Sequence, residues 1–358
     1  MTRRIGLFGL LGSGNLGNDG SLDAVLGFLE ERHPDAVVDF MCMGAEKVRE
    51  CYGLPAIPLQ WYYAKERSGA TTIPLKVLGK GIDAVRTARW VARHDVVIVP
   101  GMGVLEASLP LRAWGFPYAL LLLCASGRLF RTKVALVTVG SNPIKKRLTR
   151  LVFTTAARLA HYRSYRDAFS KDSLRRMGVD TSRDEVYPDL VFALPAPDHP
   201  AAAPGSVGVG VMAYYGGNDD RGRAGEIHSR YVNTLKRFVR WLVDEGRSVR
   251  LFVGDQVDQE VLQEIMADVR AHRPDLAPSR VTAPRVSSLD DLMREMAAVD
   301  TVVATRYHNV LCALKLGKPT LSLGYARKNE VLMAGLGLAE FCQPADALDF
   351  SLLVKQFT

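Results

Sequence analysis

Residues 301–325 read TVVATRYHNVLCALKLGKPTLSLGY. The stretch begins with a short run of apolar and β-branched residues, continues with apolar residues at helical spacing as far as Gly317, and ends with a second apolar run. Continuous apolar runs of this length are typical of parallel strands that are buried on both faces. The stretch therefore predicts a strand–helix–strand unit of the right-handed kind found in α/β proteins.

The same alternation recurs along the rest of the chain. Apolar runs predict further strands at RRIGLFGL, AVVDFMCM, DVVIVPG, KVALVTVG, SVGVGVMAY and SVRLFVGD, and helical patterns lie between them at 21–33, 83–93, 147–161, 232–245 and 288–299. Residues 193–205 show neither the periodicity of a strand nor that of a helix, and they predict a linker. We therefore expect an α/β fold of two Rossmann-like domains, 1–192 and 206–358, that face each other across a cleft, with ligands at the carboxyl ends of the strands.

Composition narrows the class of function. The 358 residues carry a formal net charge of +8, which favours anionic partners. No block of Lys and Arg marks a nucleic-acid-binding tail, so we expect no nucleic-acid partner. The five cysteines are scattered without a CxxC pair, which argues against a disulfide framework or a zinc site and for a reducing cytosol. The sequence also lacks HExxH and DxD motifs, and we expect no metal.

Three charged or aromatic residues stand where the strand of residues 301–305 turns into a helix. Arg306 can clamp an oxyanion, and His308 can transfer a proton near neutral pH because the ordinary pKa of histidine is about 6.5. Tyr307 lies between them. A lone histidine is more often a core or capping residue, but the coincidence of Arg, His, strand end and helix start favours a functional site.

Two glycine-rich turns follow strands in the first half. The first, GLLGSGNLGNDGSLDAVL, places Gly14, Asn15, Asn18 and Asp19 at a helix start, where backbone N–H groups can meet an anion. Its GxGxxG spacing is a weak signal, and the alternative is a tight turn with Asn and Asp as caps.

The second turn, VVIVPGMGVLE, places Gly101, Gly103 and Glu106 beyond a strand. A carboxylate there is well placed to face a ligand. The alternative is simple charge matching at a helix N-terminus, which contributes less than about 1 kcal/mol.

Further cations follow other strands. Arg163 and Arg166 lie in YRSYRDAFSKDSLRRMGVD, and Lys328 follows Tyr325 in SLGYARKNE. Arginine suits bidentate contacts with carboxylates and phosphates, and lysine offers a point charge. A surface Arg–Asp pair and a solvated loop lysine are the alternatives.

These motifs together resemble the polysaccharide pyruvyl transferase family over most of the chain. The most specific part is Arg-x-His followed by an apolar helix, Gly-x-Pro, a strand and Tyr-x-x-Lys, here RYHNVLCALKLGKPTLSLGYARK. The N-terminal GSGNLGND, the strand and turn VVIVPGMGVLE, and YRDAFSKDSLRRMGV also correspond. The sequence departs from the family pattern in GMG, where a run of glycines is common, and in Asn18, which separates Asp19 from the preceding glycine.

The resemblance implies a fold like that of GT-B glycosyltransferases and a transfer of the enolpyruvyl group of phosphoenolpyruvate onto two hydroxyls of a sugar or glycan, with release of phosphate. It places Arg306 and His308 in the donor site, Arg166 on the anionic donor, and Glu106 where the family carries an acid. It makes the second domain the donor side, and the first the acceptor side with part of the donor site. Phosphoenolpyruvate is the donor substrate, and no cofactor is expected.

The residues fit this chemistry in the following roles. We expect His308 as general acid and Glu106 as base. The expected donor-binding residues are Arg163, Arg166, Arg306, Tyr307 and Lys328, and the expected acceptor or loop residues are Gly14, Asn15, Asn18, Asp19, Gly101 and Gly103. A glycosyltransferase with a nucleotide-sugar donor, or an anion- or glycan-binding module without activity, remain alternatives.

The location of the protein is a separate expectation. The most apolar window, WGFPYALLLLCASGRLF, is shorter than a membrane span and predicts a buried helix. We expect a cytoplasmic protein. The basic, apolar-rich segment IKKRLTRLVFTTAARLAHYR is either a buried helix with a solvated edge, which the pattern favours, or a peripheral contact with the inner face of a membrane near a lipid-linked acceptor. The sequence does not indicate an oligomeric state.

Overall fold

The computed structural model describes residues 2–61, 73–106, 113–198, 201–217 and 220–358. Its internal contacts divide the chain into two units. The first comprises Met1–Gly14 and Ser21–Ala193, and the second comprises Asn15–Gly20 and Leu194–Thr358. Each unit has its own hydrophobic core, so we describe each by itself.

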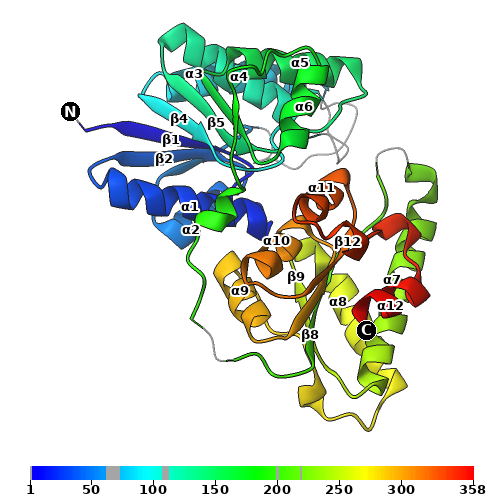
Figure 1. The fold of residues 1–358 in the computed structure, drawn as a ribbon. Coiled ribbons are helices and arrows are strands. Elements are labelled where there is room, and N and C mark those ends of the chain that lie inside the picture. Colours follow the sequence, from blue (N-terminus) through cyan, green and yellow to red (C-terminus); the bar gives the residue numbers. More distant parts are fainter. Residues whose placement is uncertain (1, 62–72, 107–112, 199–200, 218–219) are drawn as a thin grey trace. The chain divides into compact units, whose positions relative to one another are not determined.

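The first unit is built on a seven-stranded parallel sheet (Figure 1). Its order is β3-β2-β1-β4-β5-β6-β7, so the chain changes direction between β1 and β4. The strands are β1 Arg4–Gly9, β2 Val37–Cys42, β3 Ala56–Pro58, β4 Val96–Val99, β5 Lys133–Val139, β6 Tyr162–Tyr165 and β7 Glu185–Val186. Ligands of such sheets bind at the carboxyl ends of the strands, beside the change of direction.

Helices cover both faces of this sheet (Figure 1). One face carries α1 Leu16–Arg32 and α2 Ala45–Tyr52, and the other carries α3 Ile73–Val91, α4 Phe116–Phe130, α5 Arg147–Leu159 and α6 Ala168–Arg176. A short 3-10 helix, Leu190–Ala193, ends the unit. The core lies between the sheet and both helix layers, with Leu7, Phe8, Phe40 and Phe153 fully buried.

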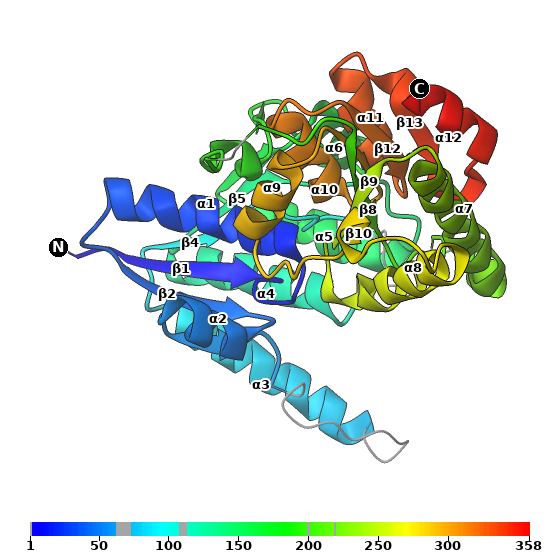
Figure 2. The same ribbon diagram turned by 90° about the horizontal axis from the view of Figure 1, so that it is seen from below.

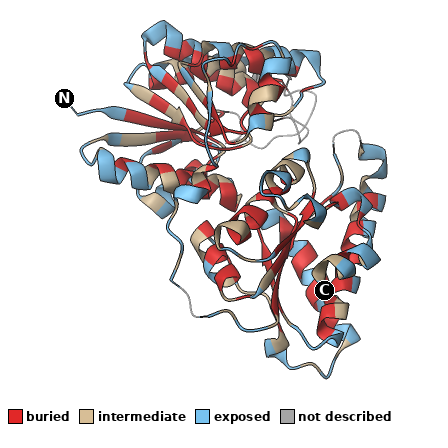
Figure 3. Ribbon diagram, viewed as in Figure 1, coloured by how far each residue is buried: buried red, intermediate tan, exposed pale blue. Residues whose placement is uncertain are grey.

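The second unit repeats the design with six parallel strands in the order β10-β9-β8-β11-β12-β13. The strands are β8 Ser206–Val211, β9 Ser248–Val253, β10 Val281–Thr282, β11 Thr301–Ala304, β12 Thr320–Gly324 and β13 Cys342–Pro344. The change of direction falls between β8 and β11. Every residue of β8 is buried, as Figure 3 shows, and a Cβ atom at Gly208 would lie 2.8 Å from the Phe252 ring.

The helices of the second unit also form two layers (Figure 1, Figure 2). They are α7 Ala224–Asp244, α8 Gln259–His272 and α12 Phe350–Phe357 on one face, and α9 Leu289–Ala297, α10 Tyr307–Lys315 and α11 Arg327–Gly335 on the other. Short 3-10 helices lie at Arg221–Arg223, Gln256–Asp258, Pro278–Arg280, Ala339–Phe341 and Ala345–Ala347. Within the described ranges, no helix is long and apolar enough to cross a bilayer.

The expected pair of Rossmann-like domains is confirmed by these two sheets. The opening stretch forms β11, α10 and β12, as its pattern predicts. Three helix starts are wrong: the helices expected from residues 21, 83 and 232 begin already at Leu16, Ile73 and Ala224. The stretch Leu16–Gly20, with its Gly and Asn residues, reads as a loop, but the N–H groups of Asn18 and Asp19 both bond the Asn15 carbonyl and start the helix earlier.

Candidate active site

The expected site residues lie just beyond the carboxyl ends of strands in their own units. In the first unit, Glu106 follows β4 and Arg166 follows β6. In the second, Arg306 and His308 follow β11, and Lys328 follows β12. β11 borders the change of chain direction in its sheet, which is the position where α/β sheets bind ligands.

A buried ion cluster centres on Arg166 in the first unit. The Arg166 side chain is 1% exposed and donates a hydrogen bond from Nη2 to Oε1 of Glu106. Its Nη1 lies 3.6 Å from Oδ2 of Asp189, and its Nε lies 3.7 Å from Oδ2 of Asp167. One guanidinium thus meets three carboxylates. The structure brings the predicted Arg166 and Glu106 together and adds Asp189, to which no role was assigned.

Glycines make room for this cluster. A Cβ atom at Gly140 would lie 2.4 Å from Oε1 of Glu106 and 2.6 Å from Nη2 of Arg166. A Cβ atom at Gly103 would lie 2.8 Å from Cδ of Glu106. Gly101 plays a different part, since its Cβ position is 2.8 Å from Oγ1 of Thr138. Gly140 was missed by the sequence reading, although it directly follows a buried strand.

Arg306 is held by a buried aspartate in the second unit. Nε and Nη2 of Arg306 donate to the two oxygens of Asp258 at 2.8 and 2.6 Å, and Asp258 also accepts from the Ala213 N–H at 2.9 Å. Burial by itself lowers the pKa of Arg306, but the Asp258 carboxylate outweighs burial and raises it. The Nη1 atom lies 4.0 Å from Oδ2 of Asp255. Arg306 is therefore a fixed cation whose Nε and Nη2 are already bound.

The turn that carries Arg306 is anchored on both sides. The Asn329 amide donates to the Thr305 carbonyl at 3.1 Å, and the Tyr231 hydroxyl lies 2.7 Å from Oγ1 of Thr305. All three residues are buried. The first turn of α10 has a further buried amide, Asn309, between Gly210 and Gly254. These contacts come from distant parts of the chain and hold the turn at one position.

The start of α1 packs against His308. A Cβ atom at Gly17 would lie 1.8 Å from Nδ1, 2.1 Å from Cγ and 2.3 Å from Cε1 of His308, so only glycine fits there. Asn15 secures the segment, because its side chain donates to Oδ2 of Asp255 at 3.0 Å, and the Leu16 N–H donates to the Gly254 carbonyl at 3.1 Å. The glycine-rich motif thus belongs by its contacts to the second unit, beside Arg306 and His308.

Tyr307 and Lys328 form a cation–π group in the second unit. The Lys328 ammonium lies 5.5 Å from the centroid of the Tyr307 ring and 5.1 Å from that of Tyr325. The Tyr307 ring meets the His308 ring edge-on at 5.2 Å. Tyr307 is buried. It therefore serves as a packing link between Lys328 and His308.

Arg163 lies in a structural network instead. Its Nε and Nη2 bond both oxygens of Asp184, and its other donors reach the carbonyls of Ala157 and Asp180. Tyr165 also donates to Asp184, at 2.7 Å. The geometry gives Arg163 the role of joining β6 to the segment before β7, which is the alternative that the sequence left open.

The remaining loop residues start α1. Gly14 has φ +90°, a left-handed conformation that favours glycine. The Asn18 N–H bonds Oδ1 of Asn15 at 3.3 Å, and Asp19 is buried in the first helical turn. Their contacts fit capping, and they do not test an acceptor role.

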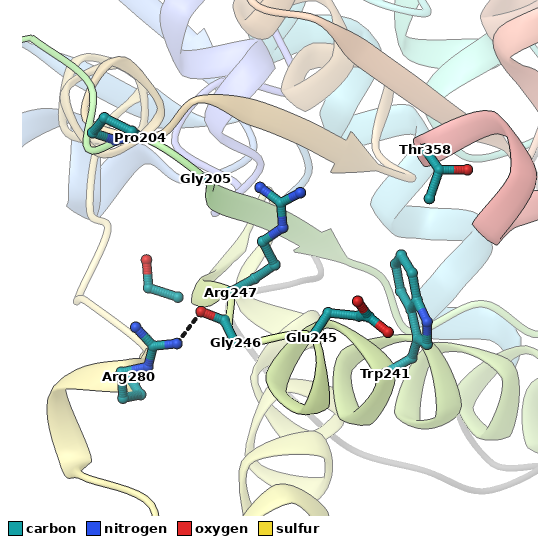
Figure 4. A pocket seen from close by; sticks show the side chains of 9 residues that line it. Pro204, Gly205, Trp241, Glu245, Gly246, Arg247, Arg280 and Thr358 are labelled. Carbon is teal, nitrogen blue, oxygen red and sulfur yellow. Dashed lines mark hydrogen bonds between the residues drawn. The ribbon is translucent and has the colours of Figure 1, made fainter.

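Two cavities lie away from the expected site residues. One of about 300 Å³ lies at the amino ends of β8 and β9 (Figure 4), where Arg280 donates to the Gly246 carbonyl. Its lining is Pro204, Gly205, Trp241, Glu245, Gly246, Arg247, Ser248, Arg280 and Thr358. Another of about 230 Å³ lies beside the end of α1. Neither contains an expected site residue.

In the part of the chain that the structure describes, no group of three His, Cys, Asp or Glu residues could hold a metal ion.

Two parallel sheets of this order in one chain define a GT-B-like α/β fold, and solved structures share it. UDP-GlcNAc 2-epimerase from Methanocaldococcus jannaschii matches with a TM-score of 0.64 at 10% identity, covering 99% of this chain and 91% of that chain. UDP-GlcNAc 2-epimerase from Neisseria meningitidis bound to UDP-GlcNAc matches with a TM-score of 0.57 at 9% identity, covering 99% of this chain and 90% of that chain. At these identities the likeness concerns the fold alone.

The family follows from the sequence itself. The family model described as polysaccharide pyruvyl transferase matches residues 15–327, which is most of the chain. The chain belongs to this family. No curated protein sequence gave a significant match.

Proposed function

We propose that the protein is a phosphoenolpyruvate-dependent, ketal-forming pyruvyltransferase that acts on a sugar or glycan. One observation carries the proposal: the Arg-x-His pair lies on an anchored turn beside the change of chain direction, with Arg306 held by Asp258 and His308 packed on Gly17. A fixed cation next to a proton-transferring side chain suits a donor substrate that is an anion and that gains a proton on carbon during the reaction.

The chemistry assigns a step to each group. C3 of phosphoenolpyruvate gains a proton while one sugar hydroxyl oxygen bonds C2, which gives a tetrahedral phosphoketal. The C2–O bond to phosphate then breaks, and a second hydroxyl oxygen bonds C2 to close the cyclic ketal. The two hydroxyls lose one proton each. One of these protons accounts for the proton gained at C3, and the other leaves with phosphate. His308 is the proposed acid for C3, and Glu106 is the proposed base for the hydroxyls.

The charged residues have complementary roles in this proposal. Because Asp258 occupies Nε and Nη2 of Arg306, the Nη1 edge is the part of the guanidinium that would meet the donor. Lys328 would assist the departing phosphate. In the first unit, the hydrogen bond from Arg166 would orient the Glu106 carboxylate toward the hydroxyls.

A second candidate is a glycosyltransferase with a nucleotide-sugar donor. The fold favours it, since UDP-GlcNAc 2-epimerase from Neisseria meningitidis, a solved structure of similar fold, is bound to UDP-GlcNAc. The two candidates differ in the donor. We expect phosphoenolpyruvate, and not UDP- or GDP-sugars, to raise the thermal midpoint, because a ligand that binds only the folded state stabilises it.

The deciding experiment measures phosphate release from phosphoenolpyruvate with a panel of sugar acceptors, and mass spectrometry of the product. We expect a product that has gained the three carbons of pyruvate. His308→Ala should abolish turnover and retain most of the donor-induced thermal shift, because the Arg306–Asp258 pair stays intact. Full activity of His308→Ala would refute the role of this residue, and absence of pyruvylated product with every acceptor would refute the proposed reaction.

The proposed setting is the cytoplasm, where the free cysteines and the donor fit a reducing compartment. A lipid-linked acceptor would bring the enzyme to a membrane surface.

A further inference from the structure

The positive charge of the chain is concentrated in one helix layer of the first unit. Helices α3, α4 and α5 contain eight Lys or Arg and one Asp or Glu, a formal charge of +7. Because the whole chain is +8, the remainder carries +1. Helices α3, α4 and α5 lie side by side on one face of the sheet (Figure 1). The excess charge therefore belongs to a single layer.

The start of α5 breaks a rule of helix stability. Lys145 and Lys146 precede the helix, Arg147 and Arg150 lie in or near its first turn, and that turn has no acidic residue. A helix N-terminus carries partial positive charge, so a cation there destabilises the helix, whereas an acid would stabilise it. Arg147 and Arg150 are exposed and have no ion-pair partner among the residues that the structure describes. Arg147 and Arg150 thus lie at a helix end where the described part of the fold gives them no carboxylate.

Apolar side chains accompany these cations. Leu148 and Leu151 of α5 are 49% and 59% exposed, and Leu129 at the end of α4 is 72% exposed. The solvent-facing side of α4, the central helix of the layer, is apolar along most of its length: Tyr118, Leu121, Leu122, Ala125 and Leu129 are partly or fully exposed. The helix expected to be buried therefore shows one apolar side to solvent, flanked by cationic helices.

We propose that the outer face of α4 and the N-terminal half of α5 dock onto an anionic lipid membrane. A soluble polyanion would need only the cations, whereas leucines exposed between arginines match the boundary between headgroups and acyl chains. The lysines and arginines attract the anionic headgroups, and Leu148 and Leu151 enter the boundary.

The docking has a consequence within the first unit. α5 begins beyond the carboxyl end of β5, on the sheet edge that also carries Glu106 and Arg166. The docked start of α5 would therefore bring this edge close to the headgroups, which suits an acceptor that is itself anchored in lipid. The docking depends on surface charge and apolar area, and it does not rest on the donor chemistry.

The test is co-sedimentation of the full chain with vesicles of phosphatidylcholine, with and without phosphatidylglycerol, at low and high salt. We expect binding to the anionic vesicles that weakens at high salt. Arg147→Gln with Arg150→Gln should weaken binding at low salt by about tenfold or more, since each cation near the surface contributes about 1 kcal/mol. Leu148→Ser with Leu151→Ser should weaken it as well, and this loss should persist at high salt.

Matched changes on the second unit serve as controls. Arg270→Gln with Arg285→Gln removes two exposed arginines, and Leu336→Ser removes an exposed leucine. The α5 arginine variant should keep or raise the thermal midpoint of the parent protein, because it removes cations from a helix N-terminus, and the other variants should keep it. A chain that remains in solution with anionic vesicles at low salt, or control variants that weaken binding as much as the α5 variants, would overturn the proposal. So would binding to soluble dextran sulfate without binding to vesicles.

Discussion

Gly17 meets the imidazole of His308 at a distance that leaves no room for a side chain. Gly17→Ala should therefore displace the ring, at a cost of about 1–3 kcal/mol in the free energy of unfolding. It should also lower kcat about a hundredfold, because a small misplacement of a reacting group has effects of that size. Urea unfolding and phosphate release check the two expectations separately.

The same helix supplies the control. A Cβ atom at Gly27 meets nothing within 4 Å, so Gly27→Ala should stabilise α1 by about 0.5–1 kcal/mol and leave activity unchanged. In a His308→Ala background, Gly17→Ala should no longer destabilise the chain. Additive effects of Gly17→Ala and His308→Ala on stability would show that the two residues do not act on each other.

The ion-pair partner of a site residue was harder to predict than the position of that residue at the end of a strand. The sequence identified Arg306, but its partner Asp258 lies in the 3-10 helix that follows β9, 48 positions earlier in the chain. Arg163 and Arg166 are three positions apart and look alike in the sequence, yet Asp184 binds the first and Glu106 binds the second. Ion pairs of this kind depend on which strands become neighbours in the sheet, and that information is not local.

Strand β2 and helix α3 are tied together by one carboxylate. Oδ1 of Asp39 accepts from the Trp90 indole at 2.5 Å and lies 3.1 Å from Nε2 of His94. Burial alone raises the pKa of Asp39, but the contacts with His94 and Trp90 outweigh it and hold the pKa below the ordinary value of 3.8. A lowered pKa in the folded state means that this carboxylate stabilises the fold above about pH 4 and loses that effect as pH falls through the folded pKa.

Asp39→Asn should accordingly lower the free energy of unfolding by about 1–2 kcal/mol at neutral pH. The deficit should shrink towards pH 3, where the parent carboxylate becomes protonated as well. Urea unfolding at both pH values measures the difference, and Asp35→Asn, on an exposed aspartate, is the control. A deficit that is equal at both pH values would contradict the ionic origin of the link.

Strands and helices could be predicted from the sequence where their local residue pattern agrees with their burial in the fold. The apolar runs of β1, β8 and β11 are buried on both faces, and those of β4, β5 and β9 alternate buried and half-buried residues, so their sequences carry the strand signal directly. The start of α1 was not predictable, because Gly17 and Gly20 have poor helix propensity and are there for other reasons. Gly17 makes room for His308, and a Cβ atom at Gly20 would lie 2.2 Å from Leu289.

The described residues form two hydrophobic cores with no residue in common. We therefore expect two unfolding transitions by calorimetry. Leu7 and Leu251 are fully buried leucines in the first and second core. Leu7→Ala and Leu251→Ala should each lower the stability of one transition by about 2–5 kcal/mol and leave the other in place. If either variant shifted both transitions equally, the units would unfold as one.

The contact between Gly17 and His308 also has an evolutionary consequence. Any L-residue at position 17 would place its Cβ within the imidazole, so neither position can change freely while the other is kept. Across the family, lineages that have lost the histidine should be those in which larger residues accumulate at the glycine, and the reverse order of substitution should be rare. Two positions separated by most of the chain would then be inherited as a pair.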